Sequence, residues 1–124
     1  MEKKMSNTQQ TKQTIKKVKS ETCKEKLNRM VDSYGEDLSS ENSNQTGYSF
    51  LIKHGYSTRY IVDSDLNYRG AEILVAGGGP NIWVCTETNT VEGYWGFDKV
   101  TCGYVDNIKI DEACEEEYNL KKGT

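Results

Sequence analysis

Hydrophobic residues concentrate in the stretch from Tyr48 to Val105, where they form short runs separated by turn residues. In the first run, Tyr48, Phe50 and Ile52 alternate with other residues, as in a strand that buries one face. This alternation predicts a strand over residues 48–53.

Further runs rich in β-branched and aromatic residues follow, and Gly, Pro, Asn or Asp separates most of them. They predict strands over residues 58–62, 71–76, 82–88, 91–97 and 99–105. Connections this short favour antiparallel neighbours, because a parallel crossover needs about a dozen residues or more. We therefore expect a four- to six-stranded antiparallel β-meander.

Ahead of the strands, apolar residues from Gln13 to Tyr34 recur mostly every three or four positions, as on one stripe of a helix. Gly35 is the expected stop, because glycine adopts the left-handed conformation without strain. The sequence thus predicts a disordered polar tail over residues 1–11 and a basic amphipathic helix over residues 12–35. The apolar stripe needs a surface, either the sheet or another subunit, so a homo-oligomer is one expectation.

Residues 36–47 are mostly Ser, Asn and other polar residues, which predicts a polar linker. After the strands, apolar residues spaced by four predict a short C-terminal helix over residues 112–120, with Asp111 as its N-cap. The expected body therefore spans residues 48–120 and belongs to the α+β class, with the N-terminal and C-terminal helices on one face of the sheet.

The net charge of −3 combines two opposite parts. Residues 1–31 carry nine Lys or Arg against three Glu, whereas residues 32–124 carry seven Lys or Arg against sixteen Asp or Glu. Such a chain suits an anionic partner at one end and a basic partner at the other, and a merely solvated surface is the alternative. No apolar run reaches the roughly 18 residues of a membrane span, and the N-terminus lacks the apolar core of a secretory signal. We therefore expect a cytoplasmic protein with reduced cysteines and no membrane contact.

Acidic and aromatic residues gather in the last strands and the C-terminal helix. Exposed aromatic residues among acids suit docking on a basic protein surface, and they suit nucleic acid poorly because phosphates would be repelled. The alternative is an aromatic core with a soluble acidic rim. The predicted partner-binding residues are Glu92, Tyr94, Trp95, Asp98, Asp106, Asp111, Glu112, Glu115, Glu116 and Glu117.

Two alternative sites remain open. The basic helix is suited to nucleic-acid phosphates, and its candidate residues are Lys12, Lys16, Lys17, Lys19, Lys24, Lys26 and Arg29. The Gly77–Asn81 loop is the other, because Gly77, Gly78 and Gly79 let the backbone approach a small ligand or an enzyme substrate closely. This loop lacks both the Lys-Ser/Thr of a P-loop and the glycine spacing of a dinucleotide fold, so a plain β-turn is also expected.

No catalytic or metal-binding motif stands out. His54 is the only histidine, and no cysteine lies in a CxxC pair or beside a nucleophile signature. We expect Cys85, Cys102 and Cys114 to act as small buried apolar residues. The sequence therefore predicts a non-enzymatic protein with no cofactor and no metal.

The chain resembles small proteins of phages and mobile elements that block bacterial defences, such as anti-CRISPR inhibitors of Cas nucleases. The resemblance lies in size, in the absence of catalytic motifs and in the acidic aromatic segment 92–119, which is less than a quarter of the chain. It rests on character and not on a matched motif. It implies host defence evasion, with acidic residues that stand in for phosphates at the DNA-binding groove of a nuclease or its nucleic-acid complex. The basic N-terminal helix departs from a pure DNA mimic.

Overall fold

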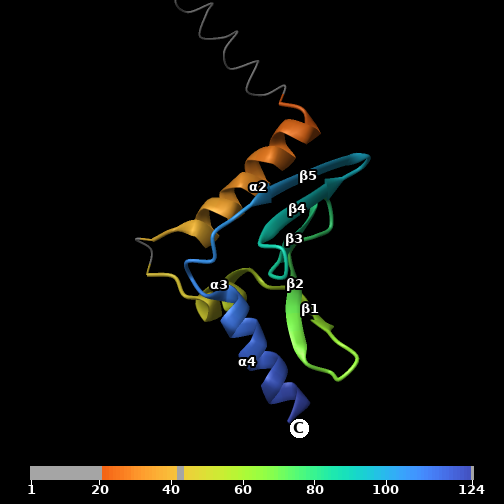
Figure 1. Cartoon of the computed structure of the whole chain (residues 1–124). Helices are drawn as coiled ribbons and strands as arrows, with labels where there is room; N and C mark the ends of the chain where they lie inside the picture. The colour runs from red at the N-terminus through yellow and green to blue at the C-terminus, as the bar shows by residue number, and fades with distance from the viewer. Residues whose placement is uncertain (1–20, 42–43, 124) are drawn as a thin grey trace, which may run out of the picture.

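The computed structural model describes residues 21–41 and 44–123, which form three helices and five strands. Figure 1 shows how these elements are arranged. In chain order they are α2 (Cys23–Ser39), α3 (Gly47–His54), β1 (Ser57–Val62), β2 (Tyr68–Ala76), β3 (Asn81–Cys85), β4 (Thr90–Trp95), β5 (Asp98–Gly103) and α4 (Ile110–Lys122). The predicted α+β class is confirmed. The predicted tail over residues 1–11 and the first part of the predicted basic helix lie outside the described residues.

The five strands form one antiparallel sheet in the order β1-β2-β3-β4-β5, so each strand pairs with its neighbour in sequence. This confirms the predicted meander. The register places Ile73 opposite Val84 and Val84 opposite Val91, and all three side chains are fully buried. They mark the face of the sheet that carries the core.

The helices cover this core face: α2 packs on β4 and β5, α4 packs on β2, and α3 packs on α4 (Figure 1). The opposite face carries the half-buried side chains of Leu74 and Trp83, which the register places side by side. There the guanidinium of Arg59 lies over the Trp83 ring, 4.0 Å from its centroid. The sheet therefore separates a helix-covered core from a mixed aromatic and charged surface.

Helix α2 packs on the sheet through Leu27, Val31 and Leu38, which are fully buried. It continues through Gly35 to Ser39, so the prediction that it ends at Gly35 is wrong. A Cβ on Gly35 would lie only 2.9 Å from the Sγ of Cys102 on β5. This glycine therefore allows the helix to approach the sheet closely, and the connection to α3 is limited to residues 40–46.

Residues 47–54 form helix α3, so the predicted strand over residues 48–53 is wrong. A capping box starts the helix: Thr46 Oγ1 accepts the backbone N–H of Ser49 at 3.1 Å, and Ser49 Oγ accepts that of Thr46 at 2.8 Å. Phe50 and Leu51 are both buried. A strand would place such consecutive residues on opposite faces, whereas a helix can turn both toward one core.

Helix α4 begins at Ile110, earlier than predicted, and runs to Lys122. The prediction of Asp111 as N-cap is wrong, because Lys109 occupies that position with a φ of 64° and no capping side chain. The carboxylate of Asp106 performs the capping instead. It accepts the backbone N–H of Ile110 at 2.8 Å and that of Asp111 at 3.2 Å, two of the donors that lack a partner at a helix start.

Candidate functional site

Helices α3 and α4 lie side by side at the end of the molecule that is far from the start of α2 (Figure 1). Gly47, the first residue of α3, sits directly on the start of α4. A Cβ at this position would be 2.3 Å from the carbonyl oxygen of Lys109 and 2.8 Å from the Cα of Ile110. The absence of a side chain here is what allows the two helices to meet.

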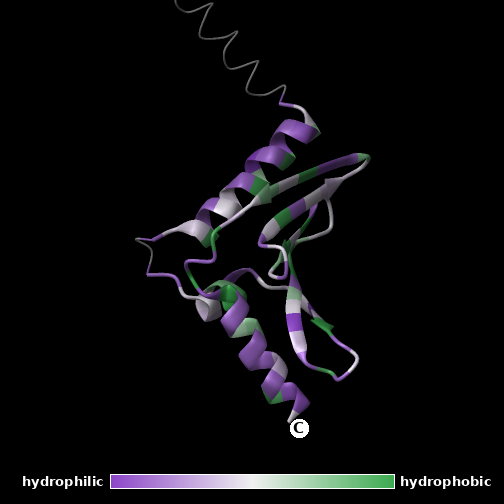
Figure 2. Cartoon of the chain, viewed as in Figure 1, coloured by the Kyte–Doolittle hydropathy of each residue, from purple (hydrophilic) through white to green (hydrophobic). Residues whose placement is uncertain are grey.

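The outward side of α4 is acidic. Ile110, Ala113 and Cys114 face the core and are buried, so helical periodicity turns Glu112, Glu115 and Glu116 together toward solvent. All three are exposed, and Figure 2 shows hydrophilic colour along much of this helix. Within α4 five acidic residues stand against two lysines, both in the last turn. Three carboxylates therefore share one exposed face.

Large exposed apolar side chains lie on α3, just after α3 and on α4. Ile52 of α3 is 85% exposed, Tyr56 after α3 is 77% exposed, and Leu120 of α4 is 69% exposed. Tyr48 is also exposed, and it lines a hollow together with Glu116 and Leu120. We call this area the acidic–apolar surface, defined by Tyr48, Ile52, Tyr56, Glu112, Glu115, Glu116 and Leu120.

A hydrogen bond joins the aromatic and acidic parts of the acidic–apolar surface. The hydroxyl of Tyr48 donates to a carboxylate oxygen of Glu116. This bond raises the pKa of Tyr48 to about 12, with smaller contributions from burial and from the negative charges of Glu116, Glu117 and Glu112. The hydrogen bond ties α3 to α4.

Comparison with protein-family models, with curated proteins and with solved structures gives no match for this chain.

The ten predicted partner-binding residues do not form one surface. Glu92 and Tyr94 lie on the sheet face opposite the helices, with the ammonium of Lys99 5.6 Å from the Tyr94 ring centroid. Trp95 is half-buried against the core, and Asp98 is half-buried beside it at the β4–β5 turn. The structure therefore divides the set: the Tyr94 hydroxyl donates to Glu92 at 3.2 Å on one face of the sheet, Trp95 pairs with Asp98, and five members lie on α4.

Two members of the predicted set have structural roles. Asp106 caps α4, as described above, and Asp111 accepts the hydroxyl of Tyr68 at 2.7 Å. Both carboxylates are half-buried, and their hydrogen bonds turn them toward the protein. Glu117 is half-buried as well, and it lines a second hollow with Ile52 and Tyr56.

Replacing Asp106 with alanine should lower the free energy of unfolding by about 1–2 kcal/mol, the usual effect of a lost helix cap. Urea denaturation followed by circular dichroism measures this change. Asp106→Asn keeps an acceptor oxygen and should lose less than half as much, whereas Glu112→Ala, which removes an exposed carboxylate without a capping role, should change stability by less than about 0.5 kcal/mol. If Asp106→Ala proved as stable as the wild type, the proposed capping role of Asp106 would be contradicted.

Sequence reasoning missed the residues of α3 that complete the acidic–apolar surface. Tyr48, Ile52 and Tyr56 are spaced by four, and the hydroxyl residues Thr46 and Ser49 stand three apart at a helix start. This capping pattern is the signal that could have identified the helix. Nothing in the sequence placed that helix beside residues 110–122, because the contact joins segments separated by the whole sheet.

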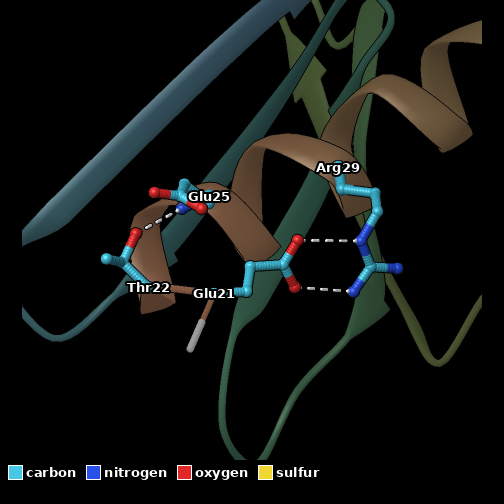
Figure 3. A network of polar contacts seen from close by, with 4 residues as sticks. All are labelled: Glu21, Thr22, Glu25 and Arg29. Atoms are coloured by element: carbon cyan, nitrogen blue, oxygen red, sulfur yellow. Dashed lines mark hydrogen bonds and ion pairs between the residues drawn. The ribbon is translucent and has the colours of Figure 1, made fainter. Parts of the chain in front are cut away.

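Only three of the seven predicted nucleic-acid-binding residues belong to the part of the chain that the structure describes. Lys12, Lys16, Lys17 and Lys19 lie outside the described residues. Of the other three, Arg29 forms an ion pair with Glu21 at 3.0 Å, shown in Figure 3 with the Thr22 cap, and the Lys26 ammonium lies 5.5 Å from the Trp95 ring centroid. Lys24 is exposed.

The glycine-rich loop connects β2 to β3 in an antiparallel hairpin, as expected for a plain turn. Gly77, Gly78 and Gly79 are all exposed. Gly78 has a φ of 85°, which favours glycine, but a Cβ at Gly78 or Gly79 would meet no atom within 4 Å. The backbone conformation at Gly78 therefore explains one glycine of this loop without a ligand.

The cysteines and the histidine pack as structural residues. Cys85 and Cys114 are buried, as predicted, whereas Cys102 is half-buried and Cys23 is exposed. His54 is half-buried against the rings of Phe50 and Tyr34. Burial lowers the pKa of His54, and the positive charge of Lys53 lowers it further. Within residues 21–41 and 44–123 we find neither a group of His, Cys, Asp and Glu residues placed to hold a metal nor a helix long and apolar enough to cross a membrane.

Proposed function

We propose that this protein is a non-enzymatic inhibitor or adaptor that binds another protein through the acidic–apolar surface. The observation that carries the proposal is a set of exposed apolar side chains around the acidic residues of α4. Tyr48 and Leu120 line a hollow with Glu116, and Ile52 and Tyr56 line another with Glu117 and Lys121. Clustered exposed apolar side chains mark interaction sites on soluble proteins. The acids favour a partner with a basic surface, because complementary charge steers association and rejects other partners.

The partner class that fits this chemistry is a protein whose own ligand is nucleic acid. Such a protein presents Lys and Arg to phosphates. The carboxylates of α4 would bind these Lys and Arg residues in place of the phosphates. The resemblance to anti-CRISPR proteins makes a CRISPR-Cas nuclease the first candidate. Binding would then compete with the nucleic acid and inhibit the nuclease in the cytoplasm of a bacterial host.

A tagged pull-down from bacterial lysate, with and without nuclease treatment, tests the proposal. We expect a stoichiometric protein partner that survives nuclease treatment. The triple variant Glu112→Lys, Glu115→Lys, Glu116→Lys should weaken its binding by at least about tenfold, or about 1.4 kcal/mol. A control triple variant, Glu25→Lys, Asp32→Lys, Glu36→Lys, makes the same change of charge on exposed positions of α2 and should retain binding.

Equal loss of binding in both triple variants would show a nonspecific effect of net charge and contradict the proposed surface. Recovery of nucleic acid alone, or of proteins lost on nuclease treatment, would favour the alternative function, nucleic-acid binding by the basic N-terminal helix. Ile52→Ser removes an exposed apolar side chain from the surface without a change of charge. It should weaken the interaction while leaving circular dichroism unchanged.

A further inference from the structure

A hollow of about 280 Å³ lies between the start of α3 and the first turns of α4. Pockets for drug-sized ligands and cofactors span about 300–1,000 Å³, so this hollow lies just below that range and has room for one side chain. Its lining residues are Thr46, Gly47, Tyr48, Ile108, Lys109, Glu112, Ala113 and Glu116. The acidic–apolar surface contributes Tyr48, Glu112 and Glu116 to it.

The wall of the hollow combines apolar and acidic groups. Ile108 and Ala113 are buried core residues, and the side-chain-free Gly47 lies between α3 and α4. Glu112 and Glu116 stand one helical turn apart, so their carboxylates lie on the same side of α4. A side chain that enters here contacts apolar groups along its length and meets two negative charges.

The carboxylates retain capacity to bind a cation. Glu116 accepts the Tyr48 hydroxyl through one oxygen, and the side chain of Glu112 forms neither a hydrogen bond nor an ion pair with any described residue. Lys109 is the cation among the lining residues, and it makes no ion pair with any described residue. With two carboxylates and one ammonium among its lining residues, the hollow keeps a net negative charge.

We propose that this hollow accepts an arginine side chain of the protein partner, an inference that rests on the proposed function. The aliphatic stem of arginine would contact Ile108 and Ala113, as long charged side chains do on apolar surfaces. Its planar guanidinium presents several N–H donors in a fixed fork, which allows it to bond two carboxylates and to stack on the Tyr48 ring. Lysine offers a point charge without the fork or the plane, so arginine fits this site better.

The test is a titration of the isotope-labelled full chain with N-acetyl-argininamide, followed by amide chemical shifts in NMR. We expect concentration-dependent shifts at Gly47, Tyr48, Glu112 and Ala113. N-acetyl-lysinamide should bind at least about threefold more weakly, because it lacks the guanidinium plane. The citrulline amide has a similar shape but no charge, and it should give no comparable shifts.

The double variant Glu112→Gln, Glu116→Gln should weaken argininamide binding on the order of tenfold, because it replaces charged hydrogen-bond acceptors with neutral ones. Gln at position 116 can still accept the Tyr48 hydroxyl, so the fold should persist. Glu115→Gln is the matched control, because Glu115 shares the acidic face but does not line the hollow. It should bind argininamide as the wild type does.

Three results would overturn the inference: no shifts around the hollow, equal shifts with the citrulline amide, or equal weakening by Glu115→Gln and the double variant. These outcomes are separate from the pull-down. A partner that is captured through α4 by a chain that does not bind argininamide would leave the proposed function intact and eliminate the arginine pocket. Argininamide binding without any captured protein would support the pocket and contradict the proposed function.

Discussion

Replacing Gly47 with alanine is expected to lower the free energy of unfolding by about 3 kcal/mol or more, at the upper end of overpacking effects. Helix propensity alone predicts the opposite sign, because alanine in a helix is favoured over glycine by about 0.8–1 kcal/mol. The packing at α3 decides between these effects. A Cβ would lie 2.3 Å from the carbonyl oxygen of Lys109 and 2.8 Å from the Cα of Ile110, and both are backbone atoms that cannot turn aside.

The methyl group therefore forces α3 away from α4. This movement would separate Tyr48 from Glu116 and open the hollow between the helices. We expect Gly47→Ala to weaken partner capture together with stability. Urea denaturation measures the first effect and the pull-down the second, and loss of the wild-type amide shifts around Ala113 would report the displaced helix directly.

Gly79→Ala is the matched control for this substitution. Gly79 lies in the exposed β2–β3 connection, where a Cβ would meet no atom within 4 Å, and it does not have the positive φ of Gly78. The same change of one methyl group should alter stability by less than about 0.5 kcal/mol. Wild-type stability in Gly47→Ala, or an equal loss in Gly79→Ala, would show that the close contact between α3 and α4 does not limit stability.

The sheet could be predicted from the sequence because its signals are local. Each strand is bounded by turn residues, and short connections permit only antiparallel neighbours. The Gly77–Asn81 loop is an example: a plain turn is expected there, Gly78 takes a φ of 85°, and Leu74 of β2 pairs with Trp83 of β3 across it. Local turn chemistry of this kind determines both the pairing and the order of the strands.

The helices show where local signals were misread. The alternation of Tyr48, Phe50 and Ile52 is compatible with a strand, but burial of the consecutive pair Phe50 and Leu51 depends on tertiary contacts that the pattern does not contain. Gly35 was interpreted as a helix stop because glycine often occupies that position. Its actual role is a close contact with Cys102 on β5, a partner 67 positions later in the sequence.

The acidic–apolar surface was predictable only in part. The carboxylates of α4 were identified, since helical periodicity alone places Glu112, Glu115 and Glu116 together. The structural roles of Asp106 and Asp111 were not identified, because they depend on tertiary structure. Asp106 caps α4 beside Lys109, which has a left-handed conformation, and Asp111 accepts the hydroxyl of Tyr68 on β2. The apolar half of the surface required the contact between α3 and α4.

The second large effect concerns alkaline pH: the free energy of unfolding should fall steeply between about pH 9 and pH 11. Four buried or half-buried groups keep their protons in the folded protein. Burial, followed by the carboxylates of Glu92 and Glu72, raises the pKa of the Cys85 thiol to about 11. Burial and, to a smaller extent, the negative charge of Asp111 raise the pKa of the Cys114 thiol to about 12.

Burial also raises the pKa of Tyr68, whose hydroxyl donates to Asp111, and that of Tyr104, which lies near Asp106. In all four groups the folded pKa exceeds the unfolded value, about 8.5 for Cys and 10 for Tyr. The stabilisation is therefore complete below these unfolded values and is lost as pH rises toward the folded ones. Each thiol that is ionised only in the unfolded chain lowers stability by at most about 1.4 kcal/mol per pH unit.

Two such thiols lower the free energy of unfolding by at most about 2.8 kcal/mol per pH unit. Over one pH unit this loss is a large part of a typical total stability of 5–15 kcal/mol. Urea denaturation in reductant at successive pH values measures it. Cys114→Ala removes one titrating group, so its stability should fall about half as steeply between pH 9 and pH 10, whatever its stability at pH 7. Added salt separates this effect from general charge repulsion, because it screens exposed charges far more than buried ones. Stability that stays constant from pH 8 to about pH 10.5 would contradict the burial of these thiols.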